Sequence, residues 1–391
     1  MVDPGLEKYV EEEIIPRYDS FDSAHREDHV RTVIKQALEF AAIYGADENV
    51  TYAAAAFHDT GLAVDRKTHH LESGKVIRTD SRLPLWLNPE QIELAAQAAE
   101  DHRASSDHAP RSIYGRIIAE ADRLIDPMTV IRRTVQFGLA HYPELDRAGH
   151  WERTLEHLHE KYADGGYLKL WIPESPNAGR LEELRRIIRE DDAGLIPEGA
   201  FETRLRDIFD RAYQRQRVLD FLKAHDIGYE MIEHPPLFTI EEALGWWEDL
   251  KDCTHCKNLF MRNHKGNRHY LISFECHKNF DIHGLEHVLH EGKLSFASPE
   301  RMMRCLGLKP GSVSPLGLTN DLCEGGSVPG ADPKELFANG HRVKFYMDRD
   351  LLNASRISFH PCDNTASLML SRDDFFRFLK IWGGEYEIIE V

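Results

Sequence analysis

The sequence lacks any apolar run approaching the roughly 20 residues that a membrane-spanning helix needs. Its first residues, MVDPGLEKYVEEE, are acidic and lack the basic and then apolar layout of a signal peptide. The cysteines are few, and the pair in CTHC, Cys253 and Cys256, is not followed by the second pair that a zinc knuckle requires. We therefore expect a cytoplasmic protein with reduced thiols, no membrane partner, and two ordinary loop thiols rather than zinc at CTHC.

Positive charge is also in short supply. The 391 residues contain 48 Lys and Arg against 66 Asp and Glu, which gives a net charge of −18. Such a surface disfavours broad binding to duplex DNA or to an anionic membrane, so neither is an expected partner. It still permits a small basic groove that grips one end of a nucleic acid. The length and the ordinary hydrophobic content predict a protein of two domains.

Strand-like alternation is scarce before residue 200, where the apolar residues recur at helical spacing. One such helix is expected to end at Gly45. After about residue 228, short β-rich runs alternate with turns and helices. A Gly and Pro break at 194–199 lies among charged helices. We predict an all-α bundle over residues 1–200 and an α+β domain with a mixed sheet over residues 201–391, joined by linker helices at about 195–215.

Histidines and aspartates gather in the helical half. The pair His58 and Asp59 ends the alanine-rich run in YAAAAFHDTGL. Further candidates lie in or beside predicted helices: His29, His70, His102 and Asp122. Imidazoles together with carboxylates suit Mn²⁺, Fe, Co²⁺, Ni²⁺ or Zn²⁺. Taken singly, however, each histidine is better explained as a surface residue or a hydrogen-bonded core residue.

The order of these residues resembles the HD superfamily of metal-dependent phosphohydrolases. The family pattern H…HD…D corresponds to His29, His58 with Asp59, and Asp122, and HDTGL matches the usual sequel to the pair. The resemblance implies an all-α bundle in which these four residues bind a divalent transition metal and Asp59 is catalytic. It also implies hydrolysis of a nucleotide-like phosphoester, so a nucleotide-like small molecule is an expected ligand.

Two more histidines fall where two-metal members of the superfamily place further ligands. His70 and His102 are therefore candidates for a second ion or for binding the substrate phosphate, and one ion or two remain open. His25 and His69 rank lower because the family's spacing favours their neighbours. Cations nearby can neutralise phosphate oxygens, although solvated surface is the commoner role for each: Arg103, Lys75 and Arg123.

Three motifs stand out in the second half, and composition alone would assign them to a plain α+β domain with polar loops. In the run CKNLFMRNHKGNRHYLISF, Lys257 precedes an apolar strand, where a single cation can meet a phosphate or ester oxygen. In GSVSP, Gly311 permits a close backbone approach to a ligand. In FHPCDNT, His360 and Asn364 lie in a loop that a proline constrains.

The order of these motifs resembles the YbaK and prolyl-tRNA-editing family, most of all its freestanding prolyl-tRNA deacylases, over about residues 215–388. The resemblance implies hydrolysis of the ester between a wrong amino acid, typically alanine, and tRNA for proline. No metal is needed, because water attacks the carbonyl with help from the terminal ribose hydroxyl, and pocket size excludes proline. The implied partners are the acceptor end of aminoacyl-tRNA for proline and prolyl-tRNA synthetase.

The resemblance also assigns residues by position. The catalytic candidates are Lys257, Asn258, Gly311, Pro315 and His360, and the substrate-binding candidates are Ser312, Ser314 and Asn364. Two segments depart from the family: the loop 323–340 is longer, and residues 246–256 replace a Gly-rich approach to the lysine. Trp246 and Trp247 in the second segment can stack on a base or pack as a lid.

Together the two resemblances predict a bifunctional hydrolase. An alternative is a nucleotide phosphohydrolase whose second domain only binds tRNA or an aminoacyl ligand and regulates it. A third hypothesis is a regulator in which one domain senses a ligand and controls the other.

Overall fold

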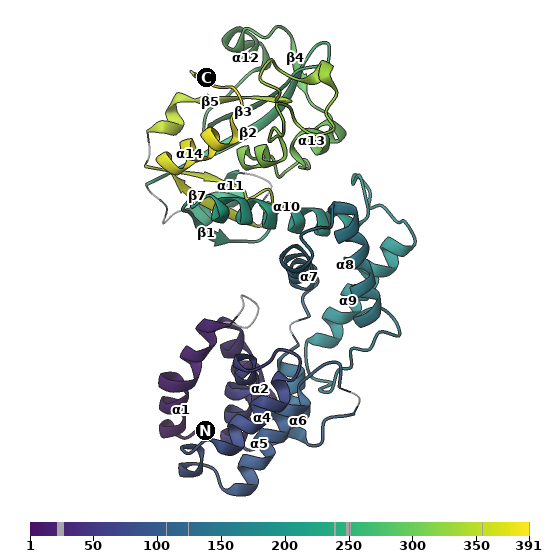
Figure 1. Cartoon of the computed structure of the whole chain (residues 1–391), viewed down its shortest axis with the longest axis vertical. Helices are drawn as coiled ribbons and strands as arrows, with labels where there is room; N and C mark the ends of the chain where they lie inside the picture. Colours follow the sequence, from purple (N-terminus) through teal and green to yellow (C-terminus); the bar gives the residue numbers. More distant parts are fainter. Residues whose placement is uncertain are drawn as a thin grey trace. The chain divides into compact units, whose positions relative to one another are not determined.

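The computed structural model describes residues 1–21, 27–106, 108–123, 125–237, 240–247, 250, 252–353 and 355–390 (Figure 1). The chain divides into two units, Met1–Ile208 and Phe209–Val391, and the boundary falls inside helix α10 (Arg204–Ala224). His25 lies outside the described residues. Within the described part of the chain, no helix has both the length and the apolar character to cross a membrane.

The described residues of the first unit form helices joined by loops and turns, with no strand, so the predicted all-α first half is confirmed. Its α-helices are α1 (Pro4–Tyr9), α2 (Glu27–Tyr44), α3 (Glu48–Phe57), α4 (His69–Thr79), α5 (Pro89–Asp101), α6 (Ile113–Ala121), α7 (Pro127–His141), α8 (Arg147–Lys161) and α9 (Asn177–Asp192). Shorter helical turns are η1 (Val10–Ile14), η2 (Ile15–Ser20), η3 (Thr60–Ala63) and η4 (Leu83–Leu85).

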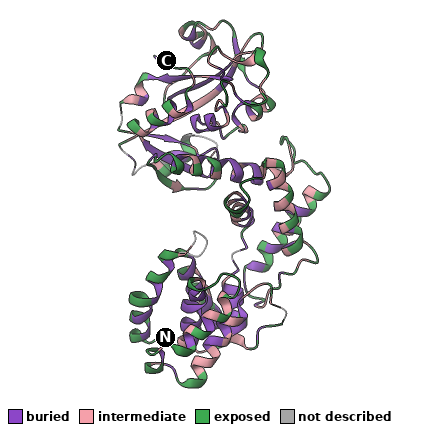
Figure 2. Cartoon of the chain, viewed as in Figure 1, coloured by how far each residue is buried: buried purple, intermediate pink, exposed green. Residues whose placement is uncertain are grey.

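Helix α3 forms the centre of this unit. It begins at the N-cap Asp47, whose carboxylate accepts hydrogen bonds from the amides of Asn49 and Val50. The small side chains of Ala53 to Ala56 are fully buried and let α2, α5 and α6 pack close to the helix. Gly45 ends α2 with a φ of 62°, as the sequence predicted. Figure 2 shows buried residues concentrated where these helices meet.

The second unit is built on a mixed sheet, which confirms the predicted α+β fold. Its strands are β1 (Glu230–Glu233), β2 (Cys253–Asn263), β3 (His269–Glu275), β4 (Leu294–Phe296), β5 (Val343–Asp348), β6 (Arg356–Phe359), β7 (Ala366–Ser371) and β8 (Tyr386–Ile389). Its helical elements are most of α10, then α11 (Ile240–Trp247), α12 (Ile282–Leu289), α13 (Pro299–Leu306), η5 (Pro315–Asn320), η6 (Pro333–Glu335), η7 (Arg349–Leu352) and α14 (Arg372–Trp382).

The strand order is β1-β7-β6-β2-β3-β5-β8, with β4 paired to β2. Strand β2 is antiparallel to β3 and parallel to β6, so it joins the two halves of the sheet. Alternate residues of β2 face different cores: Phe260 packs into one, and Met261 packs into the other. The side chain at each position of β2 therefore has a defined face.

The strand also corrects the prediction for CTHC. Both thiols lie in β2 rather than in a loop, and their separation of three residues places Cys253 and Cys256 on opposite faces of the sheet. All six cysteines are free, and burial raises the pKa of the Cys253 thiol to about 12. These two thiols consequently do not converge on one ion.

Candidate functional site

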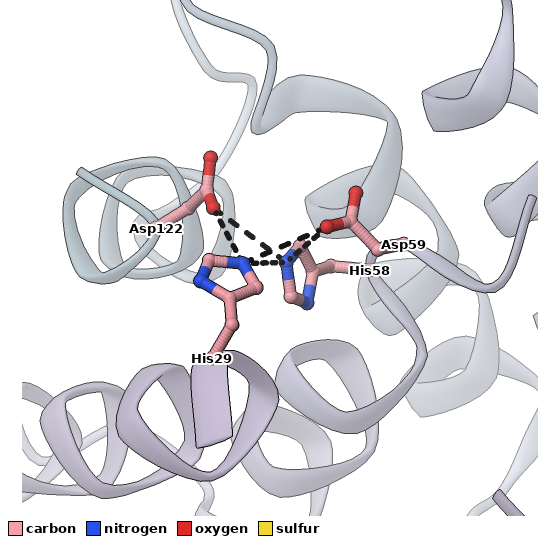
Figure 3. Close-up of side chains that lie close together, drawn as sticks. All are labelled: His29, His58, Asp59 and Asp122. Carbon is pink, nitrogen blue, oxygen red and sulfur yellow. Dashed lines mark hydrogen bonds and ion pairs between the residues drawn. The ribbon is translucent and has the colours of Figure 1, made fainter. Parts of the chain in front are cut away.

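The four residues of the H…HD…D pattern converge at one point in the first unit (Figure 3). His29 Nε2 lies 3.3 Å from His58 Nε2 and 3.2 Å from Asp122 Oδ1. Asp59 Oδ2 lies 3.2 Å from His58 Nε2 and 3.6 Å from His29 Nε2. We call His29, His58, Asp59 and Asp122 the first cluster. The sequence prediction of these four as neighbours is therefore matched by the geometry.

The ends of helices supply this cluster. His29 lies in the first turn of α2, His58 caps α3, and Asp122 caps α6. Tyr18 fixes the end of α3, because its hydroxyl donates to Ala56 O at 2.9 Å and accepts from the Asp59 amide at 3.4 Å. Because these residues lie at helix ends, their side chains can meet where the helices cross. The packing along the middle of each helix is not interrupted.

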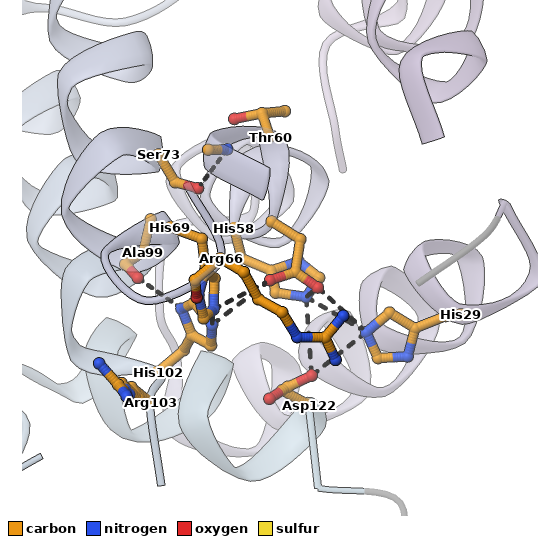
Figure 4. Close-up of polar contacts among 12 residues, drawn as sticks. His29, His58, Thr60, Arg66, His69, Ser73, Ala99, His102, Arg103 and Asp122 are labelled. Carbon is orange, nitrogen blue, oxygen red and sulfur yellow. Dashed lines mark hydrogen bonds and ion pairs between the residues drawn. The ribbon is translucent and has the colours of Figure 1, made fainter. Parts of the chain in front are cut away.

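A close backbone contact explains why the HDTGL motif has a glycine at position 61. A Cβ on Gly61 would lie 2.1 Å from His69 O and 2.6 Å from Ser73 N, which are backbone atoms of α4. The Gly61 amide donates to Ser73 Oγ at 2.9 Å (Figure 4). The missing side chain thus allows α4 to start directly against the turn that follows the HD pair, and α4 begins with His69.

A second cluster adjoins the first and shares Asp59 with it. Asp59 Oδ1 lies 3.5 Å from His69 Nε2 and 3.5 Å from His102 Nε2, and these two nitrogens are 3.1 Å apart (Figure 4). We call Asp59, His69 and His102 the second cluster. The structure corrects the ranking of the neighbouring histidines, because His69 occupies the position predicted for His70. Burial lowers the pKa of the His70 imidazole to about 4, so that ring is neutral.

Three of the histidines have a fixed ring orientation. The Nδ1–H of His58 donates to Ala55 O at 2.8 Å, that of His69 donates to Arg66 O at 2.8 Å, and that of His102 donates to Ala99 O. Each acceptor is the carbonyl three residues earlier. With the proton on Nδ1, the lone pair of each Nε2 points into a cluster, which is the usual arrangement of metal-binding histidines.

The charges in the first cluster favour a cation. Burial lowers the pKa of His58, but Asp59 and Asp122 outweigh burial and hold it well above its usual value. Burial raises the pKa of Asp59, but His58, His102 and His29 outweigh it and hold the carboxyl well below its usual range. Two carboxylates and converging imidazole lone pairs, all inside one hydrophobic bundle, fit a divalent transition metal. The donor set of both clusters therefore suits the metal dependence of an HD domain.

Two cavities open onto these clusters. A cavity of about 390 Å³ is lined by His29 and Asp122 of the first cluster. A cavity of about 240 Å³ is lined by Asp59, His69 and His102. Asp122 and Lys161 line both.

The predicted phosphate-binding cations divide into three cases. Arg103 lines the smaller cavity and donates to Lys67 O at 2.6 Å. Arg123 lines the larger cavity and is buried, so the expectation of a solvated surface residue is wrong for it. Lys75 is 66% exposed at its side chain and pairs with Glu72, as expected of a surface lysine.

In the second unit, Asn258 holds the GSVSP loop against the sheet. Its Nδ2 donates to Val313 O at 3.1 Å, and its Oδ1 accepts from Ser273 Oγ at 2.5 Å. Gly311 opens the loop with a φ of 83°, a conformation that favours glycine. Pro315, at the end of the loop, is buried and starts η5. Asn258 is thus placed to position the loop.

The two predicted serines of this loop have different contacts. Ser314 caps η5, since its Oγ accepts from the Leu316 amide at 3.2 Å. Ser312 Oγ accepts from Arg211 Nη1 at 2.7 Å. The same Arg211 nitrogen donates to Asn364 Oδ1 at 3.1 Å. Arg211, in α10, therefore joins the GSVSP and FHPCDNT loops. The sequence prediction missed it, because no motif distinguishes it among the many arginines of that helix.

His360 lines a small cavity on the Asn258 face of the sheet. The cavity is about 30 Å³ and is also lined by Trp247, Cys256 and Ser367. His360 Nδ1 donates to Ala366 O at 3.1 Å, and burial lowers the pKa of the ring. The ring is therefore neutral with a fixed orientation. Trp247 stacks on His255 with ring centroids 3.9 Å apart, which favours lid packing over base stacking.

Lys257 lies away from this group. It is inside β2 rather than before a strand, opposite the buried Phe274, and its Nζ donates to Lys278 O at 3.4 Å. Because Asn258 faces the GSVSP loop, its neighbour Lys257 faces the other side of the sheet. The structure thus brings Asn258, the loop and His360 to one face and separates Lys257 from them.

Two family models match the chain. The HD domain model covers residues 26–125, and the model described as an aminoacyl-tRNA editing domain covers residues 234–378. The first range contains every residue of both clusters. The second contains Asn258, the GSVSP loop and His360.

Curated proteins and a solved structure are similar to parts of the chain. Prolyl-tRNA editing protein ProX of Acetoanaerobium sticklandii is 33% identical over 178 residues, which is 45% of this chain and 97% of that protein. Prolyl-tRNA synthetase associated domain-containing protein 1 of Mus musculus is 31% identical over 166 residues, or 41% of this chain and 87% of that protein. The crystal structure of a predicted HD superfamily hydrolase from an uncultured Thermotogales bacterium is 24% identical and covers 31% of this chain and 68% of that chain, but its TM-score of 0.27 does not establish a fold. The chain belongs to the prolyl-tRNA-editing family, and in it an HD hydrolase domain precedes the editing domain.

Proposed function

We propose that the first unit hydrolyses a nucleotide-like phosphoester with the help of a divalent transition metal: Mn, Fe, Co, Ni or Zn. The observation that carries this is Asp59, which presents one carboxylate oxygen to each cluster. His29, His58, Asp59 and Asp122 would hold one ion, and Asp59, His69 and His102 would hold a second. When bound, such ions polarise a phosphoryl oxygen and lower the pKa of a coordinated water.

The side chains around the clusters have separate tasks in this proposal. Lys161 lines both cavities and can neutralise a phosphate oxygen from either side. Arg66 and Arg103 line one cavity each, next to the ligands (Figure 4). The backbone carbonyls that accept from the histidine Nδ1 atoms keep the rings oriented through the reaction. His58, Asp59 and His102 are buried, which strengthens these charges, while Asp122 and His69 are partly exposed.

Metal analysis together with a phosphatase screen tests this half. Purified full-length protein is expected to contain a transition metal and to release phosphate from nucleotides or from p-nitrophenyl phosphate. His58→Ala is expected to lose both properties, because it removes a ligand from the first cluster. Wild-type protein with neither bound metal nor phosphatase activity would refute the proposal.

We propose that the second unit deacylates mischarged tRNA for proline, with alanine as the amino acid removed. The supporting observation is the 33% identity with a prolyl-tRNA editing protein across 97% of that protein. The cavity of about 30 Å³ beside His360 also suits a small side chain, because a single water already needs about 10–15 Å³. We assign the methyl group of alanine to this space.

The reaction needs no metal in this proposal. Water forms a bond to the ester carbonyl carbon, the bond to the terminal ribose oxygen breaks, and the products are free alanine and the tRNA hydroxyl. The GSVSP loop places backbone N–H groups near the carbonyl oxygen and stabilises its developing charge. Asn258 and Arg211 act as positioning residues, since both hold this loop.

The partners follow from the same proposal. The acceptor end of aminoacyl-tRNA for proline is the substrate, and prolyl-tRNA synthetase is an expected partner, since relatives carry its name. Lys257, on the far side of β2, is assigned to the tRNA end rather than to the amino-acid pocket. A deacylation assay on mischarged tRNAs tests this half: wild type is expected to release alanine, and Lys257→Ala is expected to raise KM. No alanine release by wild type would refute the proposal.

A further inference from the structure

The metal clusters do not explain which side chains line the larger cavity of the first unit. Its volume of about 390 Å³ lies in the range of roughly 300–1,000 Å³ that small-molecule sites occupy. Five cationic side chains line it: Arg66, Arg123, Arg133, Arg153 and Lys161. The lining contains a single carboxylate, Asp122, which belongs to the first cluster. This excess of positive charge occurs in a chain whose net charge is −18.

Two helices outside the matched HD range supply most of this charge. Arg133 and Phe137 of α7 are four residues apart, and Arg153, His157 and Lys161 of α8 repeat at the same spacing. Residues at this spacing share one face of a helix, so each helix turns one face to the cavity. The HD model ends at residue 125, before α7 begins at Pro127. The cavity is therefore partly built by an extension of the domain.

Four of the five cations are not neutralised by an ion pair within the described residues. Among the residues that the structure describes, Arg123, Arg133, Arg153 and Lys161 form no ion pair with a carboxylate. Arginines elsewhere in the unit do so: Arg31 pairs with Glu11 and Glu27. A cluster of unpaired like charges in a hollow is costly unless an anion binds there.

Two of these arginines also have unused donors. The Nε atoms of Arg123 and Arg153 are buried and have no hydrogen-bond partner. Arg123 is 7% exposed, and its Nη1 donates to Ala119 O. Arg153 donates to Thr134 O, and its guanidinium lies 5.6 Å from the centre of the Phe137 ring. Buried donors without partners destabilise a fold, so a ligand with several acceptor oxygens would satisfy them.

The rest of the wall is apolar or aromatic. Ile125, Val130 and Leu168 line it together with Phe137 and Tyr162. A ligand that matches this wall has a ring with a hydrophobic face as well as anionic groups. Inorganic phosphate or a plain polyphosphate would leave the wall without a partner.

We propose that this cavity binds a nucleoside that carries two or more phosphate groups, with one phosphate beside His29 and Asp122 and another among the cations of α7 and α8. The proposal rests on the phosphohydrolase activity proposed above and narrows its substrate class. A nucleoside monophosphate would place its only phosphate at the metal clusters and leave Arg133 and Arg153 without an anion.

Calorimetric titration of the full-length protein, loaded with a divalent metal ion that occupies the clusters without supporting turnover, tests this. The probes are AMP, ADP, ATP and inorganic tripolyphosphate. ADP and ATP are expected to bind at least about tenfold more tightly than AMP, and ATP more tightly than tripolyphosphate. The double variant Arg133→Gln/Lys161→Met is expected to reduce the advantage of ATP over AMP to about twofold. The surface variant Lys75→Met is the matched control and is expected to keep the full advantage of ATP over AMP.

The outcomes separate the two proposals. Equal binding of AMP and ATP, or no binding of any nucleotide, would overturn the inference even if manganese-loaded protein hydrolyses p-nitrophenyl phosphate. Equal binding of ATP and tripolyphosphate would overturn the claim that the cavity recognises the nucleoside as well as the phosphates. A preference for ATP that the double variant loses would support the inference, and failure of that same protein to hydrolyse any phosphoester would count against the phosphohydrolase proposal alone.

Discussion

The Nε2 atoms of His29 and His58 lie 3.3 Å apart, although their rings come from different helices. His58 donates its Nδ1 proton to Ala55 O, so its Nε2 presents a lone pair to His29. His29 Nε2 can lie this close to that nitrogen only with a proton or a metal ion between the two. Asp59 and Asp122 add negative charge at the same point, which favours the ion.

The pair His69 and His70 provides an internal control for the second ion. His69→Ala is expected to lower the metal content of the purified protein by about one ion per chain, because it removes a ligand from the second cluster. His70→Ala is expected to leave the metal content unchanged, since its ring lies outside both clusters. Plasma mass spectrometry of the two variants measures this. If His70→Ala loses metal and His69→Ala does not, then His70 rather than His69 is the ligand of the second cluster.

Arg211 is expected to support deacylation by holding two loops together. Arg211→Met removes charge-assisted hydrogen bonds to Ser312 and Asn364, which are worth about 1.5–3 kcal/mol, so kcat/KM for deacylation should fall roughly 10–100-fold. Arg217→Met is the control on the same helix, because Arg217 is exposed and bonds Asn320 instead. A loss of the same size in both variants would mean that the helix as a whole, rather than this contact, is responsible.

Gly61 is expected to be intolerant of any side chain. Gly61→Ala would place a methyl group against the backbone of α4 at His69 and Ser73, so the unfolding free energy should fall by about 3 kcal/mol or more. Gly179→Ala in α9 meets no atom within 4 Å and should be neutral or slightly stabilising. Thermal unfolding of both variants checks this. A Gly61→Ala protein as stable as wild type would contradict the close contact.

Buried His269 predicts a loss of stability in acid. Burial and the charges of Arg301 and nearby arginines lower its pKa to about 4, and Arg301 Nη1 lies 3.1 Å from its Nε2. In the unfolded chain the ring takes up a proton near its ordinary pKa of 6.5, so the unfolded state binds more protons between these values. The contribution of the neutral ring to stability is therefore complete above 6.5 and decreases toward pH 4.

Two variants measure this contribution. His269→Gln should show a smaller drop in apparent melting temperature than wild type between about pH 7 and about pH 5. His283→Gln should behave as wild type, because the His283 side chain is 89% exposed. An unchanged drop in His269→Gln would show that other groups cause the acid sensitivity.

The first cluster could be predicted from sequence because its members follow the H…HD…D order of the HD superfamily, whereas helical spacing alone left each histidine a surface or core residue. The choice between His69 and His70 could not, since it depends on where α4 starts and how its first turn is rotated. Gly61 sets that start by a close backbone contact, and such a contact has no signature in helical periodicity.

In the second unit, strand β2 also has features that the sequence could not predict. Apolar residues mark β2 only from Leu259 onward, whereas the strand begins at Cys253. Lys257 and Asn258 therefore look equivalent in the motif, but the two-residue period of the strand sends their side chains to opposite faces. Arg211 acts across more than 100 residues of sequence, so only the folded chain brings it to Ser312.

We propose that one chain contains two independent hydrolytic sites, of which only the first needs metal. The most direct test is release of alanine from alanyl-tRNA for proline by the full-length protein, assayed with and without chelator. We expect release at the same rate in both conditions, in a preparation whose phosphatase activity the chelator abolishes. No release of alanine, or release that stops when the metal is removed, would contradict it.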